Sequence, residues 1–123
     1  MTRLALTVAI AALAFASSAL ALGGSHYAQI SANWGTPGNV DVIVVSNHSF
    51  RGDVENACVA TAGGVTHNTD ETHPLDSWFF NPVAHQYEDK TSFDISAAGA
   101  GANCTITVLD GHKVLAQQQY VSN

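Results

Sequence analysis

The stretch that decides the fold reads NCTITVLDGHKVLAQQQY over residues 103–120. Its first half alternates β-branched and aliphatic residues with polar ones, which is typical of a half-buried strand. Residues 114–121 have the pattern of a return strand, and Asp110-Gly111 between the two is a strong signal for a tight turn. The sequence therefore predicts a C-terminal β-hairpin.

Two loop geometries fit this hairpin. A two-residue turn sets Cys104 opposite Gln117, whereas a three-residue loop that ends in a left-handed glycine sets Cys104 opposite Ala116. A slip of one residue moves every side chain to the other face of the sheet, so burial decides between them. The bulged register collects four small or apolar residues on one face: Cys104, Ile106, Val114 and Ala116. We expect this register, with Leu115 as its one apolar residue on the outer face.

The N-terminal residues have the pattern of a secretory signal peptide. A short basic start precedes an apolar run from Leu4 to Phe15 and a small-x-small cleavage site at Ala19-Leu20-Ala21. The run is too short for a membrane anchor, and no later stretch is long enough to span a bilayer. We expect a signal peptide over residues 1–21 and one secreted or periplasmic domain over residues 22–123, with no membrane span.

The two cysteines are expected to form a structural disulfide. Cys58 and Cys104 are the only cysteines in the chain, and export would place them in an oxidising compartment. Joining them closes a loop of about 46 residues, which is worth roughly 3–4 kcal/mol on the chain-entropy model. A redox pair is disfavoured because the sequence has no Cys-x-x-Cys.

Charge narrows the range of partners. The chain carries four basic and ten acidic residues. Removal of residues 1–21 takes away Arg3 and leaves a net charge of −7. Nucleic acids and anionic membranes require a basic surface, which three scattered basic residues cannot form. We therefore expect no nucleic-acid partner.

The rest of the chain predicts short strands. Val40–Ser46 is apolar on both faces, which indicates a strand that lies centrally in a sheet or is covered on both sides. Glu55–Ala62 and Thr91–Ile95 are further strands, and His26–Trp34 is a poorer one. Val65–Asp76 is polar throughout, so we expect a long surface loop there with at most a short strand at its start.

Short strands separated by turn signals, without a helical repeat, indicate an all-β fold. We expect a small antiparallel β-sandwich with one disulfide. A disulfide between an early and a late strand, with Trp78 between them in sequence, resembles the arrangement in immunoglobulin-like domains. The chain departs from that pattern because Ala102 stands two residues before the second cysteine, where those domains have tyrosine.

Histidines and carboxylates gather between residues 67 and 76, and these groups can ligate copper or zinc. The candidate metal ligands there are His67 and His73. His26 is a third candidate, because Gly23-x-Ser25 also fits the cleavage rule and would make His26 the N-terminal residue. The alternative is a solvated acidic loop.

Aromatic residues follow that loop at Trp78-Phe79-Phe80, with Tyr87 nearby. Aromatic side chains dominate the energetics of binding surfaces, so this cluster is a candidate platform for a protein or a sugar. The alternative is that alternate members lie in the core, with Trp78 and Phe80 pointing one way and Phe79 the other. The candidate binding surface joins this cluster to the preceding segment: His67, Asp70, His73, Trp78 and Phe79. Arg51-Gly52-Asp53 also matches the tripeptide that integrins bind, and ordinary turn chemistry explains it equally well.

No pattern of catalytic residues is present, so the sequence favours binding over catalysis. There is no Gly-x-Ser-x-Gly and no phosphate-binding loop. We expect a binding protein whose target is another protein or a surface carbohydrate. The alternative is an extracytoplasmic copper- or zinc-binding protein that uses the histidines.

Overall fold

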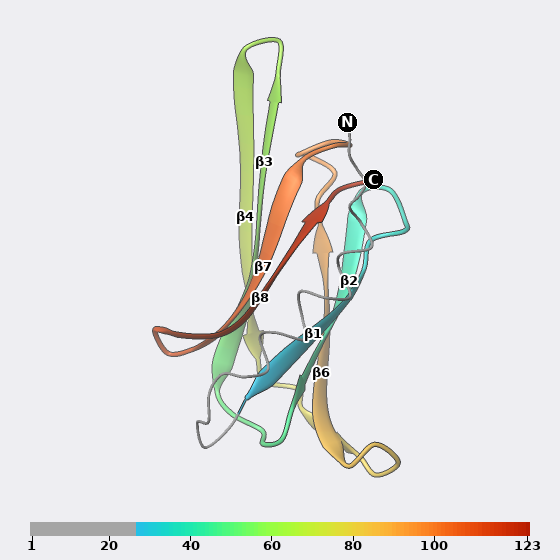
Figure 1. Cartoon of the computed structure of the whole chain (residues 1–123), viewed down its shortest axis with the longest axis vertical. Helices are drawn as coiled ribbons and strands as arrows, with labels where there is room; N and C mark the ends of the chain where they lie inside the picture. The colour runs from blue at the N-terminus through green and yellow to red at the C-terminus, as the bar shows by residue number, and fades with distance from the viewer. Residues whose placement is uncertain (1–26) are drawn as a thin grey trace.

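The computed structural model describes residues 27–123, apart from the side chain of Ala62. The predicted signal peptide and His26 lie outside the described residues. The fold is all-β, as the sequence predicts, with two antiparallel sheets of four strands (Figure 1). Sheet A has the order β1 (Ala28–Asn33), β2 (Asn39–Ser46), β6 (Gln86–Asp94) and β5 (Phe79–Asn81). Sheet B has the order β4 (Val65–Leu75), β3 (Gly52–Ala62), β7 (Asn103–Asp110) and β8 (Lys113–Val121).

The core lies between the two sheets and follows from the alternation of the strands. In β2, Val40, Val42 and Val44 are fully buried, while Ile43 and Val45 on the other face remain half-exposed. β2 pairs with β1 on one side and β6 on the other, which confirms the central position predicted for it. Burial of one face with partial cover of the other explains why Val42-Ile43-Val44-Val45 is apolar without a break.

The C-terminal hairpin forms as predicted, but both predicted registers are wrong. The turn lies at Gly111-His112, because Asp110 pairs with Lys113. Val108 then pairs with Ala116, which leaves Leu115 as an extra residue in a bulge. A bulge lets two neighbouring residues turn toward the same side of a strand. Leu115 and Ala116 are both buried, whereas Val114, predicted to face the core, is 51% exposed.

The disulfide forms between Cys58 and Cys104 as predicted, and its position differs from the immunoglobulin-like arrangement. The two residues are paired directly on adjacent strands β3 and β7, with their Cα atoms 4.0 Å apart. The bond therefore lies inside sheet B, whereas in immunoglobulin domains it joins the two sheets.

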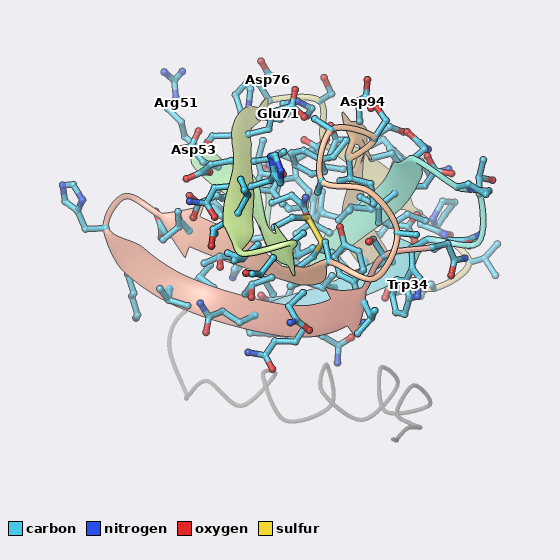
Figure 2. All side chains as sticks on the ribbon, turned by 90° about the horizontal axis from the view of Figure 1, so that it is seen from above. Trp34, Arg51, Asp53, Glu71, Asp76 and Asp94 are labelled. Carbon is cyan, nitrogen blue, oxygen red and sulfur yellow. A yellow bond between two sulfur atoms is a disulfide. The ribbon has the colours of Figure 1, made fainter. Side chains whose placement is uncertain are left out.

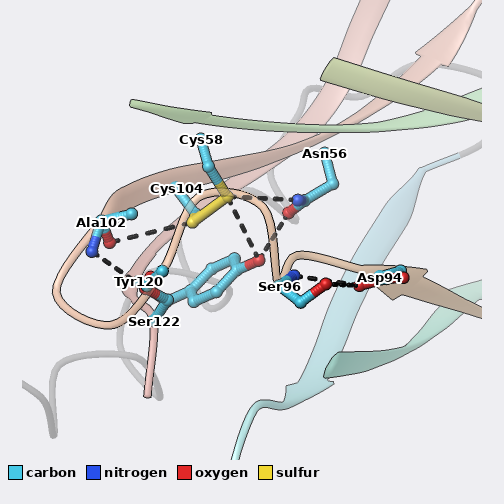
Figure 3. The surroundings of a disulfide bond; sticks show 9 residues. Asn56, Cys58, Asp94, Ser96, Ala102, Cys104, Tyr120 and Ser122 are labelled. Carbon is cyan, nitrogen blue, oxygen red and sulfur yellow. Dashed lines mark hydrogen bonds between the residues drawn. A yellow bond between two sulfur atoms is a disulfide. The ribbon is translucent and has the colours of Figure 1, made fainter. Parts of the chain in front are cut away.

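A buried polar cluster surrounds the bond (Figure 3). Tyr120 of β8 is the strand partner of Cys104 on β7. Its hydroxyl donates to Asn56 Oδ1 at 2.7 Å. Asn56 Nδ2 in turn lies 3.4 Å from Cys58 Sγ. Trp34 stacks on the ring of Tyr120 at a centroid distance of 4.9 Å, and Asn123 Nδ2 donates to Trp34 O. These contacts join the β1 edge of sheet A to the β8 edge of sheet B.

The predicted loop over Val65–Asp76 is wrong. Residues Val65–Leu75 form the eleven-residue strand β4, which pairs with β3 without a break from Gly52↔Leu75 to Ala62↔Val65. Gly63 and Gly64 connect the strands with φ angles of 59° and 79°, the left-handed conformation that a two-residue hairpin turn requires. β4 lies at the edge of its sheet and is mostly exposed, so its polar sequence lacks the apolar alternation of a buried strand.

Candidate functional site

The strand conformation of β4 separates the predicted metal ligands. His67 and His73 lie on the same face of the strand but six residues apart, which corresponds to roughly 20 Å along an extended chain. Asp70 lies on the opposite face by alternation. Within residues 27–123, no group of three or more His, Cys, Asp or Glu side chains is arranged to hold a metal ion. The two histidines therefore cannot bind one ion within a single copy of the chain.

His73 contacts sheet A. Its Nδ1 lies 2.6 Å from the hydroxyl of Thr91, and its ring stacks on Phe93 at a centroid distance of 4.3 Å. Thr91 and Phe93 belong to β6, so these contacts join the C-terminal part of β4 to the opposite sheet. The imidazole is half-buried between the sheets, which makes it a packing residue.

The outer face of β3 and β4 carries acidic side chains. Glu71 pairs with the buried Asn56 and lies on the inner face, whereas Asp53 of β3 lies on the outer face, on the side of the molecule opposite Trp34 (Figure 2). On this face a hydrogen bond between the carboxyl groups of Glu55 and Asp70 raises the pKa of Glu55, and burial and the charge of Asp70 raise it further. Two carboxyl groups therefore lie close together on this face, which makes it acidic.

Trp78 is only partly exposed. Its indole N–H donates to the carbonyl of Phe50 at 2.7 Å, and the two rings lie 5.1 Å apart. The preceding backbone N–H, that of Ser77, donates to the carboxylate of buried Asp89 at 2.9 Å. Burial raises the pKa of Asp89. These two hydrogen bonds fix the chain where it enters β5.

Beyond that anchor the chain forms a short hairpin, which we name the β5–β6 tip and define as residues Phe79–Tyr87. Asn81 Oδ1 accepts hydrogen bonds from the backbone N–H groups of Val83 and Ala84 at 3.0 and 3.1 Å, which orders the turn. His85 has a φ of 55°, in the left-handed region. In Figure 1 this tip lies at the end of the molecule opposite the Gly63-Gly64 turn.

The tip exposes large apolar side chains on both faces. Phe79 is 42% exposed, Phe80 47% and Val83 92%. Phe80 meets the rings of Tyr87 and His85 edge-on, at centroid distances of 5.2 and 6.1 Å.

On the other face of the tip, Lys90 Nζ lies 5.4 Å from the ring centroid of Phe79. Hydrogen bonds from Gln86 and Asn81 lower the pKa of Glu88 on the same strand, so its carboxylate stays ionised. Polar and charged side chains therefore surround an exposed aromatic ring on this face.

The structure does not bring the predicted binding surface together in one place. Phe79 lies at the tip and Trp78 at its anchor, whereas His67 lies near the far end of the β3–β4 hairpin. Sequence reasoning missed Val83, for which the preceding Asn81-Pro82 was the available signal, since such a pair marks a turn whose tip reaches solvent. Arg51-Gly52-Asp53 does not form a loop, because Gly52 is buried as the first residue of β3.

Comparison of the chain with family models, with curated proteins and with solved structures finds no match. Residues 27–123 contain no helix that is long and apolar enough to cross a bilayer.

Proposed function

We propose that the chain is an extracytoplasmic binding domain that docks onto another protein through the β5–β6 tip. The observation that carries the proposal is the concentration of Phe79, Phe80 and Val83 in five residues, each at least 42% exposed. Exposed apolar groups gathered at one end of a domain mark interaction sites, and aromatic residues dominate the energy of such contacts. The disulfide supports a location in an oxidising compartment.

The shape of the tip favours a protein over a carbohydrate. The tip is a convex hairpin with aliphatic Val83 at its turn, and the polar side chains of Glu88 and Asn81 already bond to each other. A convex apolar end fits a concave apolar pocket of a partner, because ligand pockets are concave and mostly apolar. A sugar would need hydrogen-bonding groups that are not already paired.

Site-specific crosslinking tests this proposal in the cells that produce the protein. A photoreactive phenylalanine analogue replaces Val83 in one variant and Val114 in a control, because Val114 is likewise an exposed valine but lies on the β7–β8 hairpin. We expect one crosslinked protein from position 83 and none from position 114. A product that contains glycan instead of protein, or equal products from both positions, would contradict the proposal.

A further inference from the structure

The free edge of β4 carries a regular row of backbone groups. In an antiparallel strand, the N–H and C=O groups of alternate residues point to opposite edges. Proline lacks the N–H and is tolerated in a strand where that group faces away from the neighbour. Pro74 is paired with Asp53 of β3, so the even-numbered residues of β4 direct their backbone groups to the free edge.

The disulfide independently gives the same assignment of which β4 residues direct their backbone groups to the free edge. A Cα–Cα distance of 4.0 Å identifies Cys58↔Cys104 as a non-hydrogen-bonded pair of β3 and β7. Cys58 therefore bonds through its backbone to its other partner, Thr69 of β4. The residues whose backbone groups face outward are then Thr66, Asn68, Asp70 and Thr72. Within residues 27–123 no strand pairs with this edge.

The sequence along this edge is complementary to itself when read in reverse. With Thr69 as the centre, an antiparallel copy places Asn68 opposite Asp70 and His67 opposite Glu71. The outermost outward-facing residues, Thr66 and Thr72, also meet each other. An amide therefore meets a carboxylate on one face and an imidazole meets a carboxylate on the other, and each pair occurs twice. A two-fold interface requires this kind of self-complementarity.

We propose that two copies of this chain associate through antiparallel pairing of their β4 strands, with Thr69 on the two-fold axis. The pairing joins the two copies of sheet B into one continuous sheet. About eight backbone hydrogen bonds form, because each outward-facing residue exchanges N–H and C=O with its opposite. The inference uses a surface separate from the β5–β6 tip and does not rest on the function proposed for that tip.

The alternative centres are less favourable. Centring the pairing on Asp70 places two copies of Asp70 opposite each other, and like charges directly opposite are destabilising. Centring it on Asn68 places His67 opposite Thr69 and leaves Glu71 without a cationic or imidazole partner. The Thr69 centre also places two threonine hydroxyls opposite each other.

The position of the hairpin leaves this edge accessible. β7 pairs with β3 only from Asp53 to Val59, so among the strands of residues 27–123 the last residues of β3 pair with β4 alone. Figure 1 shows the β3–β4 hairpin extending past the other strands at that end. The side chains of β4 from Val65 to Asn68 are exposed. The acidic outer face opposes association, and pairing Asp70 with an amide reduces that repulsion.

Two complementary charge variants test the pairing by sedimentation equilibrium. Glu71→Lys places lysine opposite His67, and His67→Glu places glutamate opposite Glu71. Either variant alone should dimerise roughly tenfold more weakly than the unmodified chain, because both copies of the pair turn unfavourable. An equimolar mixture of the two variants should regain dimers, since each interface then joins His67 to Glu71 and lysine to glutamate.

A backbone variant separates edge pairing from charge. Asn68→Pro removes an outward N–H without removing a bond to β3, so it should abolish the dimer while circular dichroism and the melting profile show the monomer folded. An unmodified chain that is monomeric at all concentrations overturns the proposal. A dimer that survives Asn68→Pro, or a mixture of the charge variants that stays monomeric, overturns it equally.

Discussion

The two edges of sheet B, β8 and β4, both carry backbone groups that another strand could pair with, and they are protected from such pairing to different degrees. β8 is interrupted by the bulge at Leu115, and the stacking of Trp34 on Tyr120 ties it to β1. β4 has eleven uninterrupted pairs, and His73 and the buried Leu75 near its C-terminal end pack toward sheet A. Bulges and covering elements are the devices with which proteins protect sheet edges. β8 has both, whereas β4 over most of its length has polar side chains in place of either device, which leaves its backbone groups accessible.

The largest loss of stability is expected when the disulfide that joins the two halves of sheet B is removed. Replacing both cysteines by serine should lower the free energy of unfolding by roughly 2–5 kcal/mol, because the bond joins β3, which carries β4, to β7, which carries β8. Urea denaturation of the oxidised protein and the variant measures this difference. Equal midpoints would show that backbone pairing alone holds β3 to β7.

The bulge on the protected edge can be tested next. Leu115→Ala should cost about 2–4 kcal/mol, because it removes a buried side chain from a filled core. The matched control Val114→Ala, on the exposed neighbour, should change stability by less than about 0.5 kcal/mol. Thermal unfolding of both variants decides between this register and a regular hairpin, in which Val114 would carry the larger effect.

The polar cluster that contains Tyr120 should make the stability of the fold depend on pH in the alkaline range. Burial raises the pKa of Tyr120 to about 12, while its bond to Asn56 acts in the opposite direction. An unfolded tyrosine titrates near pH 10, at about its model value. The folded state therefore holds a proton that the unfolded state loses, so stability is complete below about pH 10 and falls as pH rises toward 12.

Tyr120→Phe is the variant that isolates this hydroxyl. It should cost about 1–3 kcal/mol at neutral pH because Asn56 Oδ1 loses its donor. It should also flatten the stability curve between about pH 10 and 12. Denaturant midpoints measured across that range provide the test, and a variant with the slope of the unmodified chain would assign the slope to other groups.

The smallest loss of monomer stability is expected from a substitution on the free edge of β4. Asn68→Pro should change monomer stability by less than about 1 kcal/mol, because its N–H faces away from β3. Thr69→Pro is the matched control, and it should be clearly less stable because it loses a hydrogen bond to Cys58 of β3. Similar losses from the two substitutions would mean that the assigned phase of β4 is wrong.

The buried parts of the fold could be predicted from the sequence. Val40–Ser46, the disulfide and the C-terminal hairpin carry apolar or covalent signals that do not depend on distant residues. The register of that hairpin could not be predicted, because the bulge at Leu115 depends on what Ala116 and Leu115 pack against. β4 was missed because its pairing depends on β3 and on the Gly63-Gly64 turn, while its own residues resemble a loop.

The candidate site was harder to predict than the fold. The exposed aromatic Phe79 was identified, but the separation of His67 from His73 follows only once the segment is known to be extended. Val83 is one aliphatic residue in a turn, and only the preceding Asn81-Pro82 marks that turn as reaching solvent. Surface residues gain their significance from the backbone that positions them, and that backbone is set by tertiary pairing.

The placement of the disulfide between directly opposed residues also bears on how the chain folds. The hairpins β3–β4 and β7–β8 have two-residue turns and can form locally and early, whereas β3 and β7 must find each other across 46 residues. If these strands docked one residue out of step, the two thiols would point to opposite faces of the sheet and could not be joined. Oxidation therefore captures the chain only after the slow, long-range step has reached the correct alignment, and it makes that alignment hard to reverse.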